Sequence, residues 1–431
     1  MRIRKIMLVL ALISGAIFFV SLVGIEGFNN YSNSIENNYF ILAVGIDKAT
    51  TEGEKVKITI ISEKFSNSEN ENNKEADIVS TEGETVLDAL IQFDYFMEKK
   101  LFWGHLGYIV IGDEVAKDNM LDYLDFFIRD HGIRYDAVLT IAKDMTAEEL
   151  FRQTEKSEKF LPDTLDSIFD NRIWLSVSRK VALSEAIKIF ANKNIDVYLP
   201  YLTVKTETGD SLESIPTSSK ENKESSGENQ NSSSNSKLDN NQKIEIPRIY
   251  LEGLAVFSGE NLVEYIAPDE SRALNFIENH IESGIIMVKD SQDDKISTEI
   301  VDSKSKINVN LDKENKLTVN IDIEFSTNIS EIFSRKDIFY FEKLNELEKS
   351  QSNKIKAQVE SLISIMKKNK IDVINLNKFV NLKYPLRWDK LHDQKEDIIN
   401  NATFNINVKS KINRTYHVKE SIRVKKENKG E

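Results

Sequence analysis

The sequence predicts an α+β protein of two to three domains, with mixed or antiparallel sheets, flanking helices and one N-terminal transmembrane helix. Its 431 residues are enough for two or three domains of ordinary size. Segments in which apolar and polar residues alternate are interspersed with segments of helical periodicity, a pattern that favours layered α+β architecture. A long apolar run next to basic residues at the N-terminus adds the membrane helix.

The N-terminal segment, residues 1–28, is expected to be a signal anchor. Arg2, Arg4 and Lys5 precede an uncharged apolar run over residues 6–25, which as a helix spans a hydrocarbon core of about 30 Å. The basic residues favour the cytoplasmic side, so the bulk of the chain is expected on the extracytoplasmic side. A cleaved signal peptide is the alternative, but its apolar region is commonly shorter, roughly 7–15 residues, and ends at small residues. The exit from the run offers no good cleavage site, so an uncleaved anchor is favoured.

Residues 36–205 are expected to form an N-terminal α+β domain. Residues 39–47 read as an apolar strand, and residues 55–62 alternate strictly enough to be its antiparallel partner. A helix capped near Thr85 places its apolar residues on one face. The remaining expected elements are a strand at 108–111, a helix at 115–129 and a strand at 137–142.

Residues 206–243 differ from the rest of the chain. They consist largely of Ser, Asn, Glu, Lys, Thr and Gly, which bury too little apolar surface to offset the entropy of ordering, so they predict a disordered polar loop. Residues 244–335 then predict a middle β-rich domain, and residues 336–425 a C-terminal α+β domain with a long helix. The expected elements of these domains are strands at 250–257, 262–265, 307–311, 317–325 and 403–412, and helices at 271–280 and 338–369.

Composition excludes several classes of function. The chain has 57 basic and 70 acidic residues, a formal net charge of −13, whereas nucleic-acid binding depends on basic residues that neutralise phosphates. It has no cysteine, which excludes disulfides, thiolate metal sites and cysteine nucleophiles. The five histidines show no ligand spacing, and no P-loop, G-x-S-x-G or H-E-x-x-H motif occurs. We therefore expect a non-enzymatic protein without metal or cofactor, and without a nucleic-acid partner.

The most unusual local cluster is KKLFWGHL at residues 99–106, and two interpretations of it are open. In the first, Phe102, Trp103, Gly104 and His105 form a recognition corner, where the glycine lets another backbone approach closely. In the second, Phe102 and Trp103 fill the core while His105 bonds to a local carbonyl. Asp47, at the end of the first strand, poses a similar choice between a ligand-binding carboxylate and a turn-forming aspartate, of which the turn is favoured.

The sequence resembles the Ger(x)C family, the C subunits of spore germinant receptors in endospore-forming Firmicutes. The resemblance runs in the order and spacing of the family from about residue 35 to about residue 422, so it covers nearly the whole exported part. The motifs that carry it are LAVGIDK at 42–48, GET at 83–85, LFWGHL at 101–106, IGDE at 111–114, FIRD at 127–130, IR at 133–134, LAVF at 254–257, DESRAL at 269–274, YPLRW at 384–388 and INRT at 412–415.

The resemblance implies a three-domain α+β fold and a non-enzymatic subunit that works beside the A and B integral membrane subunits in the spore inner membrane. There it would support receptor assembly and nutrient-germinant signalling in spore germination. The alternative is a stand-alone cell-surface protein that binds a small ligand or a cell-wall fragment. The residues that we select as candidates for partner docking are Phe102, Trp103, Gly104, His105, Arg129, Asp130 and Arg134.

The chain departs from the family pattern in three places. Family members usually carry a lipidated N-terminal cysteine, which this chain lacks, so the helix at 6–25 is expected to replace the lipid anchor. Asn375 and Tyr416 stand where the family tends to have glycine, and a second tryptophan after Trp388 is missing. These changes indicate a divergent member of the family.

Overall fold

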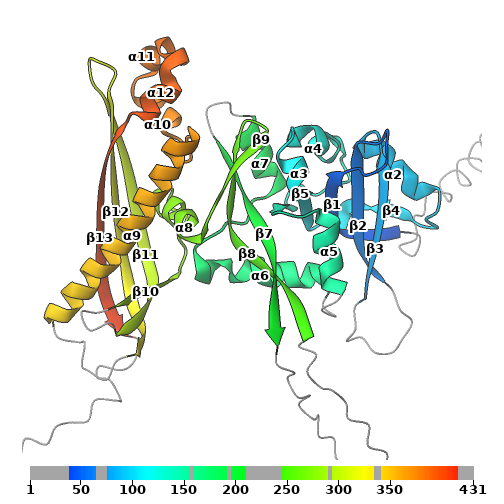
Figure 1. Ribbon diagram of the computed structural model, residues 1–431, viewed down its shortest axis with the longest axis horizontal. Coiled ribbons are helices and arrows are strands. Elements are labelled where there is room, and N and C mark those ends of the chain that lie inside the picture. Colours follow the sequence, from blue (N-terminus) through cyan, green and yellow to red (C-terminus); the bar gives the residue numbers. More distant parts are fainter. Residues whose placement is uncertain are drawn as a thin grey trace, which may run out of the picture.

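Two β-sheets with packed helices make up the part of the chain that the computed structural model describes, residues 38–64, 75–155, 160–191, 196–209, 244–289, 294–333 and 341–415 (Figure 1). One sheet has nine strands and the other has four, which confirms the mixed α+β class. The expected membrane helix at 6–25 lies outside the described residues. Within them, no helix combines the length and the apolar character that a membrane crossing requires.

The N-terminal sheet has the strand order β3-β2-β1-β5-β6-β7-β8-β9, and β4 pairs with the start of β1. Its centre, from β1 through β5 and β6 to β7, is parallel, whereas the outer strands are antiparallel. β5 and β6 are buried at every position, as expected of parallel strands covered on both faces. The strands are β1 Asn38–Lys48, β2 Val56–Lys64, β3 Glu75–Gly83, β4 Lys100–Phe102, β5 Tyr108–Gly112, β6 Val138–Ala142, β7 Val197–Gly209, β8 Ile244–Ser258 and β9 Asn261–Ile266.

Helices cover both faces of this sheet. Apolar residues of α2, α3, α4 and α7 share one core cluster with the sheet, and those of α5 and α6 share a second. The helices are α2 Val86–Asp94, η2 Trp103–His105, α3 Asp113–Ala116, α4 Met120–Arg129, α5 Ala147–Glu155, α6 Leu161–Leu175 and α7 Leu183–Phe190.

Two details of the predicted helices have a clear physical basis. Thr85 caps α2 as predicted, because its hydroxyl accepts the N–H of Asp88 at 3.1 Å. The single helix expected at 115–129 is wrong, since α3 and α4 are separate helices. Asn119 between them adopts a left-handed φ of 48°, and its N–H donates to Asn261 at 2.8 Å. Asparagine tolerates that backbone better than most residues, so the chain turns there.

The C-terminal sheet has the order β10-β11-β12-β13, with β13 parallel to β12 and the other pairs antiparallel. Along β12, Ile321 and Ile323 are buried while Asp322 and Glu324 are exposed, which confirms one apolar and one wet face. The elements are α8 Pro268–Ile277, β10 Ile285–Lys289, β11 Lys295–Leu311, β12 Leu317–Phe333, α9 Phe341–Asn369, α10 Leu376–Lys383, α11 Pro385–Lys390, η3 His392–Gln394, α12 Lys395–Asn400 and β13 Thr403–Thr415.

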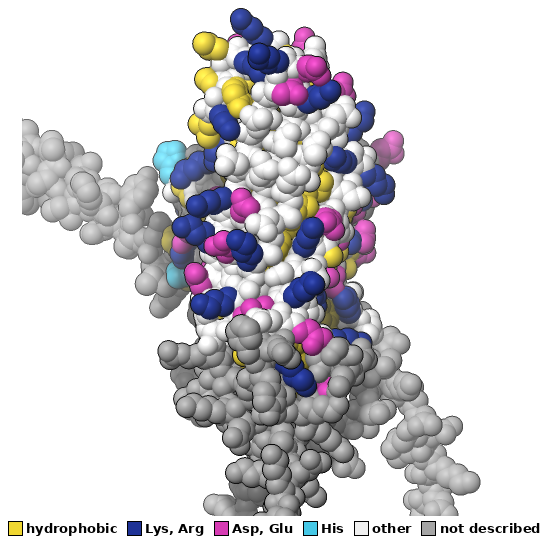
Figure 2. Space-filling view, turned by 90° about the vertical axis from the view of Figure 1, so that its left-hand side faces the viewer, with side chains coloured by type: hydrophobic (Ala, Val, Ile, Leu, Met, Phe, Trp, Pro, Cys, Tyr) yellow, Lys and Arg dark blue, Asp and Glu magenta, His cyan; other side chains and the backbone are white. Residues whose placement is uncertain are grey.

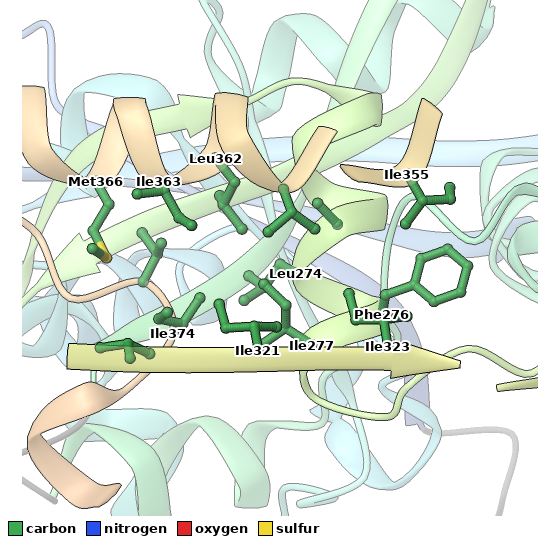
Figure 3. Close-up of a cluster of buried hydrophobic side chains, with 14 of the residues drawn as sticks. Leu274, Phe276, Ile277, Ile321, Ile323, Ile355, Leu362, Ile363, Met366 and Ile374 are labelled. Carbon is green, nitrogen blue, oxygen red and sulfur yellow. The ribbon is translucent and has the colours of Figure 1, made fainter. Parts of the chain in front are cut away.

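The apolar face of this sheet packs against α8 and the long helix α9 (Figure 3). The long helix α9 runs along β12, and the apolar residues on one of its faces point toward that strand. They form one layer of core side chains together with the apolar residues of β12 and α8. The labelled members of this core are Leu274, Phe276, Ile277, Ile321, Ile323, Ile355, Leu362, Ile363, Met366 and Ile374. The opposite side of the C-terminal unit carries charged and other polar side chains (Figure 2).

Each of the two sheets contains strands from two of the domains that were predicted from the sequence. β8 and β9 continue the N-terminal sheet, although residues 244–335 were expected to form a middle domain. β12 pairs with β13, so the four-stranded sheet joins the expected middle and C-terminal domains. Residues 206–209 belong to β7 and pair with residues 244–247, so the loop predicted at 206–243 starts too early in the sequence. Its remaining residues, 210–243, lie outside the described residues. The polar composition of residues 206–209 does not favour a strand. Backbone pairing with β8 stabilises this end of β7.

A buried polar network links the N-terminal sheet to the C-terminal unit. Arg179 forms an ion pair with Glu278 at 2.7 Å and lies 4.7 Å from the ring centre of Tyr198 on β7. The amide of Asn375 donates to the Tyr198 hydroxyl at 2.8 Å and to Glu278 at 3.1 Å. Asn375 also has a left-handed φ of 57°, which explains how it occupies a position where glycine is usual in the family.

Candidate docking surface

Three aromatic rings meet at the expected recognition corner. β4 runs parallel to the first residues of β1 and continues directly into η2, which brings Phe102 and His105 next to Phe40. The ring of Phe40 lies 5.4 Å from that of Phe102 and 5.1 Å from that of His105, edge-on in both pairs. Phe102 is 40% exposed and His105 is exposed, so part of this aromatic cluster faces solvent.

Trp103 points the other way. Its side chain is only 9% exposed and belongs to the core of the N-terminal sheet. The indole packs edge-to-face on Phe127 of α4, with ring centres 5.9 Å apart. The ring therefore fills the core and is not presented to a partner, unlike its two neighbours Phe102 and His105.

Gly104 serves the corner itself. A Cβ at this position would lie 2.6 Å from two atoms of the Phe102 ring, far inside the usual contact distance. The space next to the glycine is thus occupied by a side chain of the same corner, not left open for the backbone of another molecule. A side chain at this position would require the partly exposed Phe102 ring to move aside.

The second group of candidates lies at the end of α4. Arg129 pairs with Asp125 at 2.8 Å, Asp130 accepts the N–H of Gly132 at 2.7 Å, and Arg134 donates to Asp136 at 2.9 Å. These local bonds fix the turn after α4, while the side chain of Arg129 stays exposed. Surface ion pairs of this kind contribute little stability, so exchanging Asp125 or Asp136 for a carboxylate of a partner would cost little.

A groove of about 710 Å³ runs between α2 and the same end of α4. Leu87, which is exposed, and the half-buried Phe126 supply its apolar lining, and Arg129 and Asp130 contribute charges. The contact of Trp103 with Phe127 connects this region to the aromatic corner through the core. The structure thus gives two groups, Phe102 with His105 and Arg129 with Asp130, whereas Arg134 does not line the groove.

Asp47 has a role that its sequence context did not reveal. It is buried, its Oδ1 accepts the N–H of Ala147 at 2.7 Å, and its Oδ2 accepts the N–H of Glu148 at 3.0 Å. Burial raises the pKa of this carboxyl from 3.8 to about 6, although the two hydrogen bonds act in the opposite direction. Asp47 therefore caps the N-terminus of α5 across the sheet, and both of its oxygens are already used.

A second buried carboxylate lies near the polar network described above. Asp372 accepts the N–H groups of Leu376 and Asn377 at 2.7 and 2.8 Å, and its own N–H donates to Asp196 at 2.8 Å. Burial raises the pKa of Asp372 to about 7. It caps α10 and ties that helix to the residue before β7, a contact between residues 176 positions apart that no sequence pattern indicated. In the described part of the chain, no group of three or more His, Asp or Glu side chains is arranged to hold a metal.

Comparisons with known proteins agree with this architecture. The model of the spore germination protein N-terminal domain matches residues 31–204, and that of the spore germination B3/GerAC-like C-terminal domain matches residues 252–416. Spore germination protein KC of Bacillus subtilis (strain 168) is 21% identical over 323 residues, which are 73% of each chain. The crystal structure of the GerBC protein superposes with a TM-score of 0.52 at 17% identity, covering 86% of this chain and 98% of that one, and so shares the fold.

The two family matches lie on either side of the segment 210–243 and together include both sheets, apart from residues 205–209 of β7 and 244–251 of β8. They also include the aromatic corner, the groove and the polar network between the sheets. This chain belongs to the Ger(x)C family of spore germination proteins, the family of germinant-receptor C subunits.

Proposed function

We propose that this chain is a non-enzymatic, membrane-anchored C subunit of a spore germinant receptor, which supports receptor assembly and nutrient-germinant signalling. Membership of the Ger(x)C family supports the receptor role. The apolar run at residues 6–25, preceded by Arg2, Arg4 and Lys5, supports an anchor in the spore inner membrane with the bulk of the chain on the extracytoplasmic side. Its partners are the A and B integral membrane subunits.

The observation that carries the docking proposal is the exposed aromatic corner on a rigid support. Phe102 is 40% exposed but packs on Phe40 and over Gly104, so its ring is already ordered before a partner binds. Preordered aromatic side chains lose little entropy on binding and are frequent anchors of protein interfaces. Arg129 and the groove that it lines form a second docking surface, which offers charge and apolar area.

The test is co-purification of the full chain with the A and B subunits from spore membranes. Phe102→Ala and Arg129→Ala should each lower the recovery of both subunits while circular dichroism stays native. Val263→Ala is the matched control, since Val263 is 41% exposed on β9, away from the corner. Wild-type recovery with both docking variants would remove the corner from the interface, and failure of the wild-type chain to recover either subunit would contradict the receptor role.

The groove also supports a second candidate function, capture of a small ligand or a cell-wall fragment by this chain alone. Its volume of about 710 Å³ falls within the range of small-molecule sites, roughly 300–1,000 Å³. Calorimetry of the full chain in detergent, titrated with germinants and with muropeptides, separates the two functions. A scaffold gives no binding heat, whereas a ligand-binding protein gives heat that Leu87→Asp abolishes.

A further inference from the structure

The end of the C-terminal unit exposes two large apolar side chains. Leu382 on α10 is 73% exposed, and Leu386 on α11 is 83% exposed. These helices project at one end of the molecule (Figure 1), and hydrophobic side chains gather at this end among Lys and Arg (Figure 2). Single exposed apolar residues are ordinary on a protein surface, but two leucines this exposed on one projecting end indicate a contact surface.

The charge around these leucines is opposite to that of the chain as a whole. Lys378 and Lys390, both exposed, stand four residues before Leu382 and four residues after Leu386. In residues 376–391, four basic residues accompany a single acidic one, Asp389, in a chain with a net charge of −13. Three exposed acidic residues follow, Asp393 of η3 and Glu396 and Asp397 of α12, and Glu396 lines a separate pocket with Asp196 and Asp372. The excess of positive charge thus belongs to α10 and α11, the two helices that carry the exposed leucines, and not to η3 and α12 after them.

The two leucines are held on a rigid base. Arg387 donates to the carbonyl of Leu311 at 3.1 Å and to the side chain of Asn315 at 2.6 Å, which fastens α11 to the turn between β11 and β12. Lys383 donates to the carbonyl of Val309 at 2.6 Å, and Trp388 is fully buried in the core. A surface that is ordered before binding loses little conformational entropy on contact.

We propose that the tip formed by Lys378, Leu382, Leu386 and Lys390 contacts the surface of an anionic phospholipid bilayer. The leucines enter the interface between headgroups and acyl chains, and the two lysines face lipid phosphates. Basic amphipathic surfaces bind anionic interfaces in this way. The contact rests on the proposed function in one respect, because the anchor at residues 6–25 is what keeps the tip close to a bilayer. It would set the orientation of the C-terminal unit relative to the membrane.

The absence of cysteine makes a direct test possible. The full chain with Leu386→Cys has a single thiol, which is labelled with an NBD dye. The labelled chain is reconstituted in vesicles of phosphatidylcholine with or without phosphatidylglycerol. We expect NBD emission to be brighter and blue-shifted in the anionic vesicles relative to the neutral ones. Spin-labelled lipid should quench this emission, and high salt should reduce the fraction of chains that show it. Val301→Cys, at a site 45% exposed on β11, is the control and should respond to neither lipid.

A second variant tests the lysines separately from the leucines. Lys378→Gln combined with Lys390→Gln should lower the ratio of lipid-contacting to aqueous NBD populations by roughly fivefold per lysine at low salt, with circular dichroism unchanged. A label at Leu386 that stays aqueous in anionic vesicles, or responds equally to neutral ones, overturns the proposal. A response that appears only when the A and B subunits are added also overturns it, in favour of an acidic protein surface.

Retention of the chain in vesicles after alkaline carbonate extraction reports on the anchor independently. A retained chain with an aqueous label contradicts the tip contact alone. A chain that carbonate releases, but whose label still responds to anionic vesicles, contradicts the anchor and supports the tip contact.

Discussion

Replacing Trp103 by alanine should destabilise the N-terminal unit and not merely weaken docking. The indole is 9% exposed and packs edge-to-face on Phe127, so the change removes a large core side chain and an aromatic contact. Substitutions of buried Trp or Phe by Ala cost about 3–5 kcal/mol, of which the aromatic pair contributes about 0.5–1.5 kcal/mol. We therefore expect a loss of about 4 kcal/mol in the free energy of unfolding, a large part of the stability of an ordinary domain.

Urea unfolding of the full chain in detergent, followed by circular dichroism, measures this loss. The change should shift the midpoint of the transition of the N-terminal unit to lower urea. If Trp174 of α6 is also replaced by Phe, the remaining fluorescence of the variant comes from Trp388, which is buried in the C-terminal core and follows the other unit. Phe102→Ala is the adjacent control, because its partly exposed ring should cost less than about 1.5 kcal/mol. A Trp103→Ala protein with the wild-type midpoint that no longer binds the A and B subunits would refute the core assignment.

Three further substitutions test the buried polar contacts. Because burial raises the pKa of Asp47 from 3.8 to about 6, the folded state holds its proton more tightly, so wild-type stability should fall relative to Asp47→Asn by about 3 kcal/mol as pH rises from about 4 to about 6; the same pH dependence of unfolding free energy in both proteins across this range would contradict the raised pKa. Gly112→Ala places a Cβ in steric overlap with Oδ1 of Asp47 and should cost roughly 1–3 kcal/mol, seen as a lower melting temperature, whereas in Gly107→Ala the added Cβ meets only the carbonyl oxygen of Leu42 at 3.6 Å, an ordinary contact distance. Asn375→Ala should be less stable than Asn375→Gly by roughly 1–2 kcal/mol, since both lose the bonds to Tyr198 and Glu278 but only alanine is strained at a φ of 57°; equal urea midpoints would show that the strain is absent.

The docking candidates show how far the sequence could lead to the site. The cluster at 99–106 was recognisable because aromatic residues, glycine and histidine stand side by side before an apolar strand. Which ring faces the core depends on the contact between Trp103 and Phe127, which the sequence does not contain. The groove likewise requires α2 and α4 to lie next to each other, and the lipid-facing tip requires α10 and α11 to be held on the β11–β12 turn.

The local order of the chain followed from its sequence. The alternation of β1 and β2, the cap at Thr85, the hairpin of β8 and β9 and the periodicity of α9 all depend on residues a few positions apart, and the distributed motifs pointed to the Ger(x)C family. The tertiary structure alone decided that β8 joins the N-terminal sheet, that Asp47 caps α5 and that Asn375 links the two units. Sheet edges, burial and buried hydrogen bonds are settled by contacts between residues distant in the sequence, 177 positions apart in the pair of Asn375 and Tyr198. Such contacts leave no local periodicity or composition in the chain.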